Sequence, residues 1–155
     1  MPMPANPPRN LSSPFASFRG HHVGVRVPDF EAACDWYVEK LDFRVLHSWA
    51  GLDLSWAYLS PAADDEFHLE IMGGPVQREA PILDSVIDGL SNAGFLHFCL
   101  EVDDVEAAVA ELERRGVVVT LPVMENPEIS RKLAFVRDPW GNMIELSQRT
   151  VGALA

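Results

Sequence analysis

The stretch HFCLEVDDVEAA (residues 97–108) repeats the earlier stretch HVGVRVPDFEAA (residues 22–33) at a constant offset of 75 residues, 97 minus 22. Both stretches begin with histidine and end on Glu-Ala-Ala. The same offset, continued without a gap, places Glu70 of LEIM over Glu145 of IELS. Self-similarity at a fixed spacing indicates two copies of one supersecondary unit.

The first copy predicts one strand, one helix and then three strands. Alternating valines predict a strand over residues 21–27, and Asp29 is the expected N-cap of a helix over about residues 30–40. Apolar side chains recur at helical spacing along that helix. The three strands that follow are FRVLHSWA, LSWAYLS and EFHLEIM, separated by turn-forming residues.

The second copy repeats this order. A strand over residues 95–102 leads into a helix over about residues 105–115, capped by Asp103 or Asp104 and stopped by Gly116. Strands at VVVTL, LAFVRD and MIELSQ complete the unit, with DPWGN as a tight turn. We predict three parts: an N-terminal flexible arm (1–20), a single domain (21–149) and a tail (150–155). The domain consists of module one (21–72), a linker (73–94) and module two (95–149). The linker is expected to contain a short helix around ILDSVIDGL.

Composition and charge exclude several classes of partner. The net charge is −11, from 12 Lys and Arg against 23 Asp and Glu, and such a chain repels phosphate backbones and anionic membrane surfaces. We therefore expect neither a nucleic-acid nor a membrane partner. Proline interrupts the opening MPMPANPPRN, which does not look like an export signal, and Cys34 and Cys99 are expected to be buried, reduced thiols. These features predict a cytoplasmic location.

Strand alternation predicts where the repeated histidines and glutamates point. Successive side chains of a strand face opposite sides, so each of these residues lies opposite the apolar set that must pack on a helix. A lone polar residue there is ordinarily only solvated. The coincidence of His with His and Glu with Glu favours a shared role. Two imidazoles and two carboxylates are a suitable ligand set for one divalent metal, Ni, Zn, Co, Mn or Fe. The candidate ligands are His22, Glu70, His97 and Glu145.

Together with FVRDPWGNMIEL near the end of the chain, these motifs resemble the vicinal oxygen chelate superfamily of glyoxalases, bleomycin-resistance proteins and extradiol dioxygenases. The resemblance covers about residues 21–149. It implies an α+β fold in which two paired βαβββ modules form a curled mixed sheet with a cup-shaped cavity. It also implies that the four candidate ligands hold one metal, in a set similar to that of glyoxalase I, and that the protein is a homodimer.

The resemblance further implies a metal-dependent lyase or isomerase acting on a small substrate with two adjacent oxygens. The metal would stabilise the charge that forms when a proton leaves carbon, and Glu70 or Glu145 would shuttle that proton. Arg26 stands where bacterial glyoxalase I has a glutathione-binding arginine, and His68 faces the cup beside Glu70, so both are predicted to bind substrate. Gly74 replaces an asparagine of those enzymes, which argues against glutathione as co-substrate.

Three alternatives remain open from the sequence. Extradiol dioxygenases of the group use Fe(II) with two histidines and one glutamate, so one glutamate here would then not be a ligand. A drug-binding protein of the bleomycin-resistance type would need no metal, although such proteins generally lack the His and Glu set. The last alternative is a scaffold of this superfamily without activity.

Overall fold

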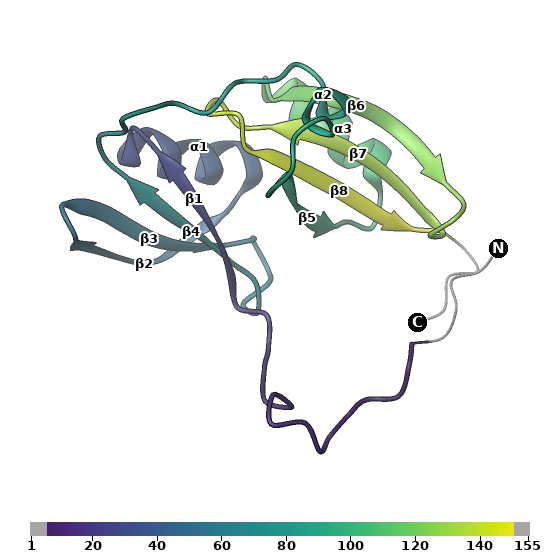
Figure 1. Ribbon diagram of the computed structural model, residues 1–155. Helices are drawn as coiled ribbons and strands as arrows, with labels where there is room; N and C mark the ends of the chain where they lie inside the picture. Colours follow the sequence, from purple (N-terminus) through teal and green to yellow (C-terminus); the bar gives the residue numbers. More distant parts are fainter. Residues whose placement is uncertain (1–5, 151–155) are drawn as a thin grey trace.

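The computed structural model describes residues 6–150, with eight strands and three helices in the order of two repeated units (Figure 1). Module one contains β1 (His22–Val27), α1 (Phe30–Leu41), β2 (Arg44–Gly51), β3 (Leu54–Ser60) and β4 (His68–Gly73). Module two contains β5 (His97–Glu101), α3 (Val105–Arg114), β6 (Val118–Asn126), β7 (Arg131–Arg137) and β8 (Met143–Arg149), and the linker contains α2 (Val86–Gly89). The two predicted βαβββ units and the short linker helix are confirmed.

The two sheets have the same strand order. The first is β1-β4-β3-β2 and the second is β5-β8-β7-β6. In each sheet the first strand of the module pairs in parallel with the last, and the other neighbours are antiparallel. This α+β architecture agrees with the prediction, but the two sheets remain separate and open within one chain. Their shared topology places equivalent residues of the repeat at equivalent positions.

Short polar residues set the ends of the long helices. The Asp29 carboxylate accepts a hydrogen bond from the Ala32 backbone N–H at 3.0 Å and caps α1. Of the two candidates for α3, Asp104 is the cap, and it accepts from the Ala107 N–H at 2.9 Å. Gly116 follows α3 with φ +81°, a left-handed conformation that glycine adopts without strain.

The helices lie between the two sheets and share one continuous core with both. That core combines residues of module one with residues of module two. At its centre the buried Tyr37 hydroxyl of α1 donates to the Asp138 carboxylate of the β7–β8 turn at 3.0 Å. Arg115, after α3, pairs with Asp42, after α1, at 2.8 Å. The helices therefore fix the two modules relative to each other.

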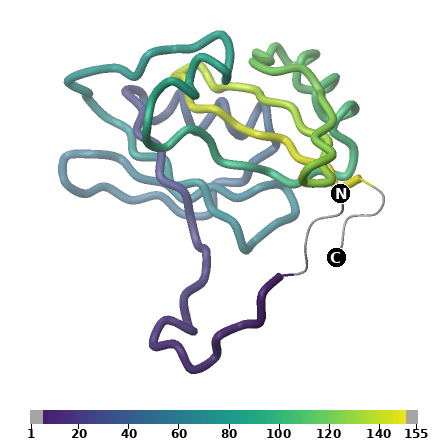
Figure 2. The backbone as a smooth tube through the Cα atoms, turned by 45° about the vertical axis from the view of Figure 1, so that its right-hand side comes forward, coloured from purple at the N-terminus to yellow at the C-terminus, as the bar shows by residue number. Residues whose placement is uncertain are grey.

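The segments outside the modules differ in how they pack. The linker places Val86 of α2 in a smaller cluster with Leu133, Phe135 and Met143 of the second sheet. Residues 6–20 contain turns but no helix or strand and extend away from the two sheets (Figures 1 and 2). Residues 1–5 of the predicted arm and 151–155 of the predicted tail lie outside the described residues. No helix within residues 6–150 is long and apolar enough to cross a membrane.

Candidate functional site

The first His–Glu pair lies on neighbouring parallel strands of module one. His22 begins β1, and the register pairs the next residue on its face, Gly24, with Glu70 of β4. This register brings His22 Nε2 to 3.7 Å from Glu70 Oε2. The His22 side chain is 37% exposed and the Glu70 side chain 13%. An imidazole and a carboxylate thus converge on one partly open sheet face.

The second pair repeats this arrangement in module two. Here Cys99 of β5 is opposite Glu145 of β8, and His97 Nε2 lies 2.8 Å from Glu145 Oε2. In both sheets the alternate residues that face the helices are buried, such as Ile71 in β4 and Ile144 in β8, each with no exposed surface. The predicted alternation is therefore observed.

The two pairs do not join into one cluster within the chain. No group of three or more His, Cys, Asp and Glu side chains in residues 6–150 is placed to hold a metal ion. The cause is the arrangement of the layers. Because the helices lie between the sheets, each pair sits on a face turned away from them. Within one chain the four predicted ligands therefore form two separate His–Glu pairs, which we call the first half-site (His22 and Glu70) and the second half-site (His97 and Glu145).

Tyr58 of β3 completes the first half-site and was missed by the sequence analysis. It is opposite Glu70 in the sheet register, its ring lies 5.5 Å from that of His22, and its hydroxyl hydrogen-bonds to the Glu70 carboxylate. Partial burial, followed by this hydrogen bond and the carboxylate charge, raises the pKa of Tyr58. The alternation of LSWAYLS would have found it, since Trp56, Tyr58 and Ser60 share one face.

The equivalent position in the second half-site is occupied by Phe135 of β7. It is opposite Glu145, and its ring meets that of His97 edge-on at 5.0 Å. Phe135 has no hydroxyl group to donate. The two glutamates of the repeat thus have different neighbours, one polar and one apolar.

Two further histidines border the first half-site. His68 Nδ1 lies 2.7 Å from the Ser60 hydroxyl, which donates its proton to the Phe67 carbonyl at 3.0 Å. Because that hydroxyl has only one proton, Nδ1 of His68 is the donor in this contact. His21 Nδ1 lies 2.8 Å from His22 Nδ1.

Arg26 lies on the same face as His22 but is directed at the backbone. Its guanidinium group donates to the carbonyl oxygens of Val27, Met72, Gly74 and Pro75, at 2.6, 3.0, 3.1 and 2.8 Å. These bonds hold the chain as it leaves β4. The structure therefore gives Arg26 a role in shaping the edge of the half-site.

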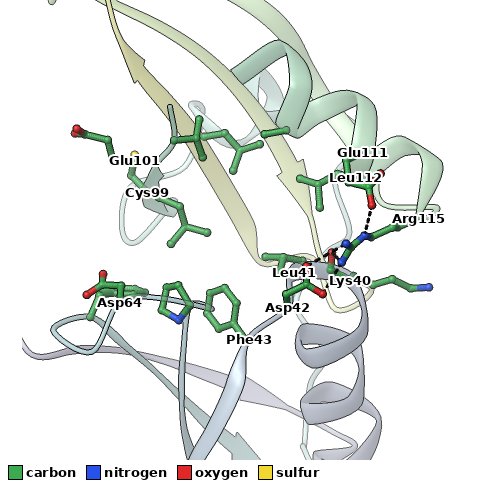
Figure 3. Close-up of a pocket in the computed structure, with 16 residues that line it drawn as sticks. Lys40, Leu41, Asp42, Phe43, Asp64, Cys99, Glu101, Glu111, Leu112 and Arg115 are labelled. Atoms are coloured by element: carbon green, nitrogen blue, oxygen red, sulfur yellow. Dashed lines mark hydrogen bonds and ion pairs between the residues drawn. The ribbon is translucent and has the colours of Figure 1, made fainter. Parts of the chain in front are cut away.

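A separate cavity of about 450 Å³ lies between the modules and contains none of the four predicted ligands (Figure 3). Cys99 and Glu101 of β5 line one side, and the Arg115 ion pairs close one end. Cys99 is exposed there, so its predicted burial is wrong, whereas Cys34 is buried as predicted. The error arose because Cys99 shares the open face of β5 with His97. Partial burial of its sulfur and the nearby Glu145 charge raise the pKa of the Cys99 thiol to about 11.

Comparison with known proteins relates this geometry to a family. Residues 19–146 match the model of the Glyoxalase/Bleomycin resistance protein/Dioxygenase superfamily. Lactoylglutathione lyase of Schizosaccharomyces pombe is 26% identical over 148 residues, which cover 84% of this chain and 47% of that protein. Human mitochondrial methylmalonyl-CoA epimerase is 25% identical over 136 residues, which cover 84% of this chain and 73% of that protein.

Among solved structures, a glyoxalase family protein from Enterococcus faecalis superposes with a TM-score of 0.68 and 25% identity, over 84% of this chain and 97% of that one. The superfamily match spans both modules, including every strand that carries a His–Glu pair. The chain belongs to the Glyoxalase/Bleomycin resistance protein/Dioxygenase superfamily.

Proposed function

We propose that the protein is a metal-dependent lyase or isomerase of glyoxalase type, acting by proton transfer on a small substrate with two adjacent oxygens. The observation that carries this proposal is the repeated His–Glu pair, with nitrogen and oxygen 3.7 Å apart in module one and 2.8 Å apart in module two. Residues that only met solvent would not need to recur in both identity and geometry.

The donor set fits a divalent transition metal. Metal bonds to histidine nitrogen and carboxylate oxygen are about 2.0–2.2 Å long, so the Nε2 and Oε2 atoms of each pair are close enough for one ion to bond both. The four ligands would be His22, Glu70, His97 and Glu145. When bound, the metal would hold the two substrate oxygens and stabilise the negative charge that develops as a proton leaves the adjacent carbon.

The residues of the chain would divide the remaining work. A carboxylate of Glu70 or Glu145 would accept the proton and return it to the neighbouring carbon. The Tyr58 hydroxyl, bonded to Glu70, would restrict how that carboxylate turns. His68 lies on the same face with its Nδ1 held by Ser60, and its Nε2 would contact a polar group of the substrate.

We further propose that each complete site forms between two copies of the chain. One copy would supply His22 and Glu70, and the other His97 and Glu145. The separation of the pairs within one chain supports this arrangement, as does the frequent occurrence of dimers in the superfamily. The names of the yeast lyase and the human epimerase support the reaction class.

The first test is elemental analysis of untagged protein, with wild type beside Glu70→Ala and Glu113→Ala, which removes an exposed carboxylate of α3. We expect about one equivalent of Ni, Zn, Co or Mn per site in the wild type and in Glu113→Ala, and a marked loss in Glu70→Ala. Iron that survives Glu70→Ala would favour the dioxygenase alternative. Protein without any metal would favour a drug-binding role.

The second test addresses the shared site. Chains with both His22→Ala and Glu70→Ala would be mixed, during refolding or coexpression, with chains carrying His97→Ala and Glu145→Ala. Each variant alone lacks one half of every site, but a mixed dimer regains one intact site of two. Metal binding restored only in the mixture would support the two-chain site, and no restoration in a proven mixed dimer would contradict it.

A further inference from the structure

Beside the first half-site, four ring side chains form a continuous surface on the first sheet. We call this surface the aromatic row, and its members are His47 and Trp49 of β2 and Trp56 and Tyr58 of β3. The His47 and Trp49 rings are 5.6 Å apart with planes 17° apart, and the Trp49 and Trp56 rings are 5.9 Å apart with planes 13° apart. Three neighbouring rings therefore share nearly one orientation.

The aromatic row is continuous with the predicted metal ligands. Trp49 lies 5.0 Å from Tyr58, and Tyr58 in turn contacts His22 and bonds to Glu70. A ligand held at His22 and Glu70 would therefore meet ring surface as soon as it extended toward β3 and β2. The sheet register explains the alignment, because Trp49 is directly opposite Trp56 and Tyr58 is directly opposite Glu70.

The aromatic row offers mainly ring faces, since two of its four polar groups are already engaged. The Trp56 indole N–H already donates to the Gly51 carbonyl at 2.8 Å, and the Tyr58 hydroxyl is bonded to Glu70. The row contains no carboxylate, although the chain has a net charge of −11. Trp49, Trp56 and Tyr58 are each partly exposed, so ring surface remains for a ligand. Such surfaces favour stacked or edge-to-face contact with another ring.

We infer that the aromatic row binds a planar, conjugated group of the substrate, while the adjacent oxygens of that substrate lie at His22 and Glu70. This inference rests on the proposed function and adds the substrate class to it.

A series of hydroxamates tests the inference, because each carries the same two chelating oxygens and none is turned over. Binding of acetohydroxamate, benzohydroxamate and 2-naphthohydroxamate to metal-loaded protein would be measured by calorimetry. We expect affinity to rise about 2- to 12-fold with each added ring, the range expected for one aromatic contact. Trp49→Leu should remove most of this rise and leave acetohydroxamate binding unchanged. The control Trp140→Leu, which lies outside the row, should retain the rise in affinity with each added ring.

The outcomes separate this inference from the proposed function. Equal affinity for the three compounds would overturn the role of the row and leave the metal site intact. If no metal or hydroxamate binds, the proposed function fails, and the row is tested by 2-naphthamide with metal-free protein. If the wild type binds 2-naphthamide and Trp49→Leu does not, a planar ligand on the aromatic row is still supported. If the wild type does not bind 2-naphthamide, the inference is overturned. If Trp49→Leu instead dissociates the dimer and the wild type shows no ring preference, a second copy covers the row and the inference is wrong.

Discussion

The two open sheet faces carry the same ligand pair in different surroundings. In module one the carboxylate of Glu70 has a hydroxyl neighbour, Tyr58, and the Tyr58 ring is surrounded by the rings of His21, His22, Trp49 and His68. In module two the carboxylate of Glu145 is beside Phe135, and α2 and the linker cover part of the same face. The repeat has therefore preserved the atoms that would bind a metal, whereas the surrounding residues differ. Under the proposed function, module one would therefore contribute most of the substrate recognition.

The first strands of the two modules also differ at the position opposite the glutamate. Gly24 in β1 corresponds to Cys99 in β5. A Cβ atom at position 24 would lie 2.9 Å from the Met72 methyl group and 3.5 Å from Glu70 Oε2. A side chain at position 24 would have to displace the Met72 methyl group, the end of a flexible side chain, and would then lie in ordinary contact with Glu70.

The largest expected effect is on the free energy of unfolding, and it compares the turns that precede the last strand of module two and of module one. Asp138 is fully buried and accepts hydrogen bonds from Tyr37, from the Trp140 N–H and from the backbone and side chain of Asn142. Asp138→Ala would leave these donors unpaired and lower the free energy of unfolding by about 3–5 kcal/mol. Asp64→Ala, in the exposed loop of module one, removes only the bond from the Glu66 N–H and should lower it by about 0.5–1.5 kcal/mol. Denaturant unfolding measures both, and equal effects would contradict the comparison.

The second prediction makes the two half-sites alike. Tyr58→Phe removes the hydroxyl that holds Glu70, and loss of such a partner typically lowers metal affinity about 10- to 100-fold. Phe135→Leu, at the equivalent place in module two, removes no hydrogen bond and should change metal affinity little. Competition with a chelator of known affinity measures both constants. A loss in Phe135→Leu that matched the loss in Tyr58→Phe would show that packing rather than the hydroxyl matters.

A third, smaller effect reports the charge beside the second half-site. With a pKa of about 11, the exposed Cys99 thiol should react with iodoacetamide about tenfold faster for each pH unit between 7 and 10. Buried Cys34 should remain unmodified in the folded protein. Glu145→Gln removes one of the causes that raise the Cys99 pKa, so the rate at pH 8 should increase a few-fold. Peptide mass spectrometry assigns the site, and an unchanged rate would place Glu145 too far away to matter.

The smallest effect concerns the helix ends that join the modules. Hydrogen bonds from Arg114 and then Arg115 lower the pKa of Glu111 from 4.5 to about 2. A lowered folded-state pKa means that this carboxylate stabilises the fold above pH 4.5 and that the contribution is lost as the pH falls toward 2. The stability difference between wild type and Glu111→Gln should therefore shrink between pH 6 and pH 2. A difference that is constant over this range would contradict the assignment.

The repeat made the fold predictable, because it fixed the order of elements and the face of each strand. The capping residues Asp29 and Asp104 and the strands that carry the four ligands follow from local chemistry. Two features were missed although strand alternation contains them. The alternation of LSWAYLS places Tyr58 on the face of the ligands, and that of HFCLE places Cys99 on the open face of His97.

The separation of the half-sites, by contrast, lay beyond the sequence. It depends on both helices packing between the sheets, through contacts such as the bond from Tyr37 to Asp138, which are 101 residues apart. Alternation specifies the face of a strand but not the direction in which one module faces the other.

The parallel pairing of the first and last strand in each module has a consequence for the order of folding. His22 and Glu70 are 48 residues apart, 70 minus 22, and so are His97 and Glu145, 145 minus 97. Bringing the two residues of a pair together closes a long loop, which costs chain entropy. That cost is not offset by new contacts until the helix and the two strands between the two residues have formed. If the pairs bind metal as proposed, a partly synthesised or partly unfolded module would present lone histidines that hold metal weakly, and the ion would bind only after β4 and β8 are complete.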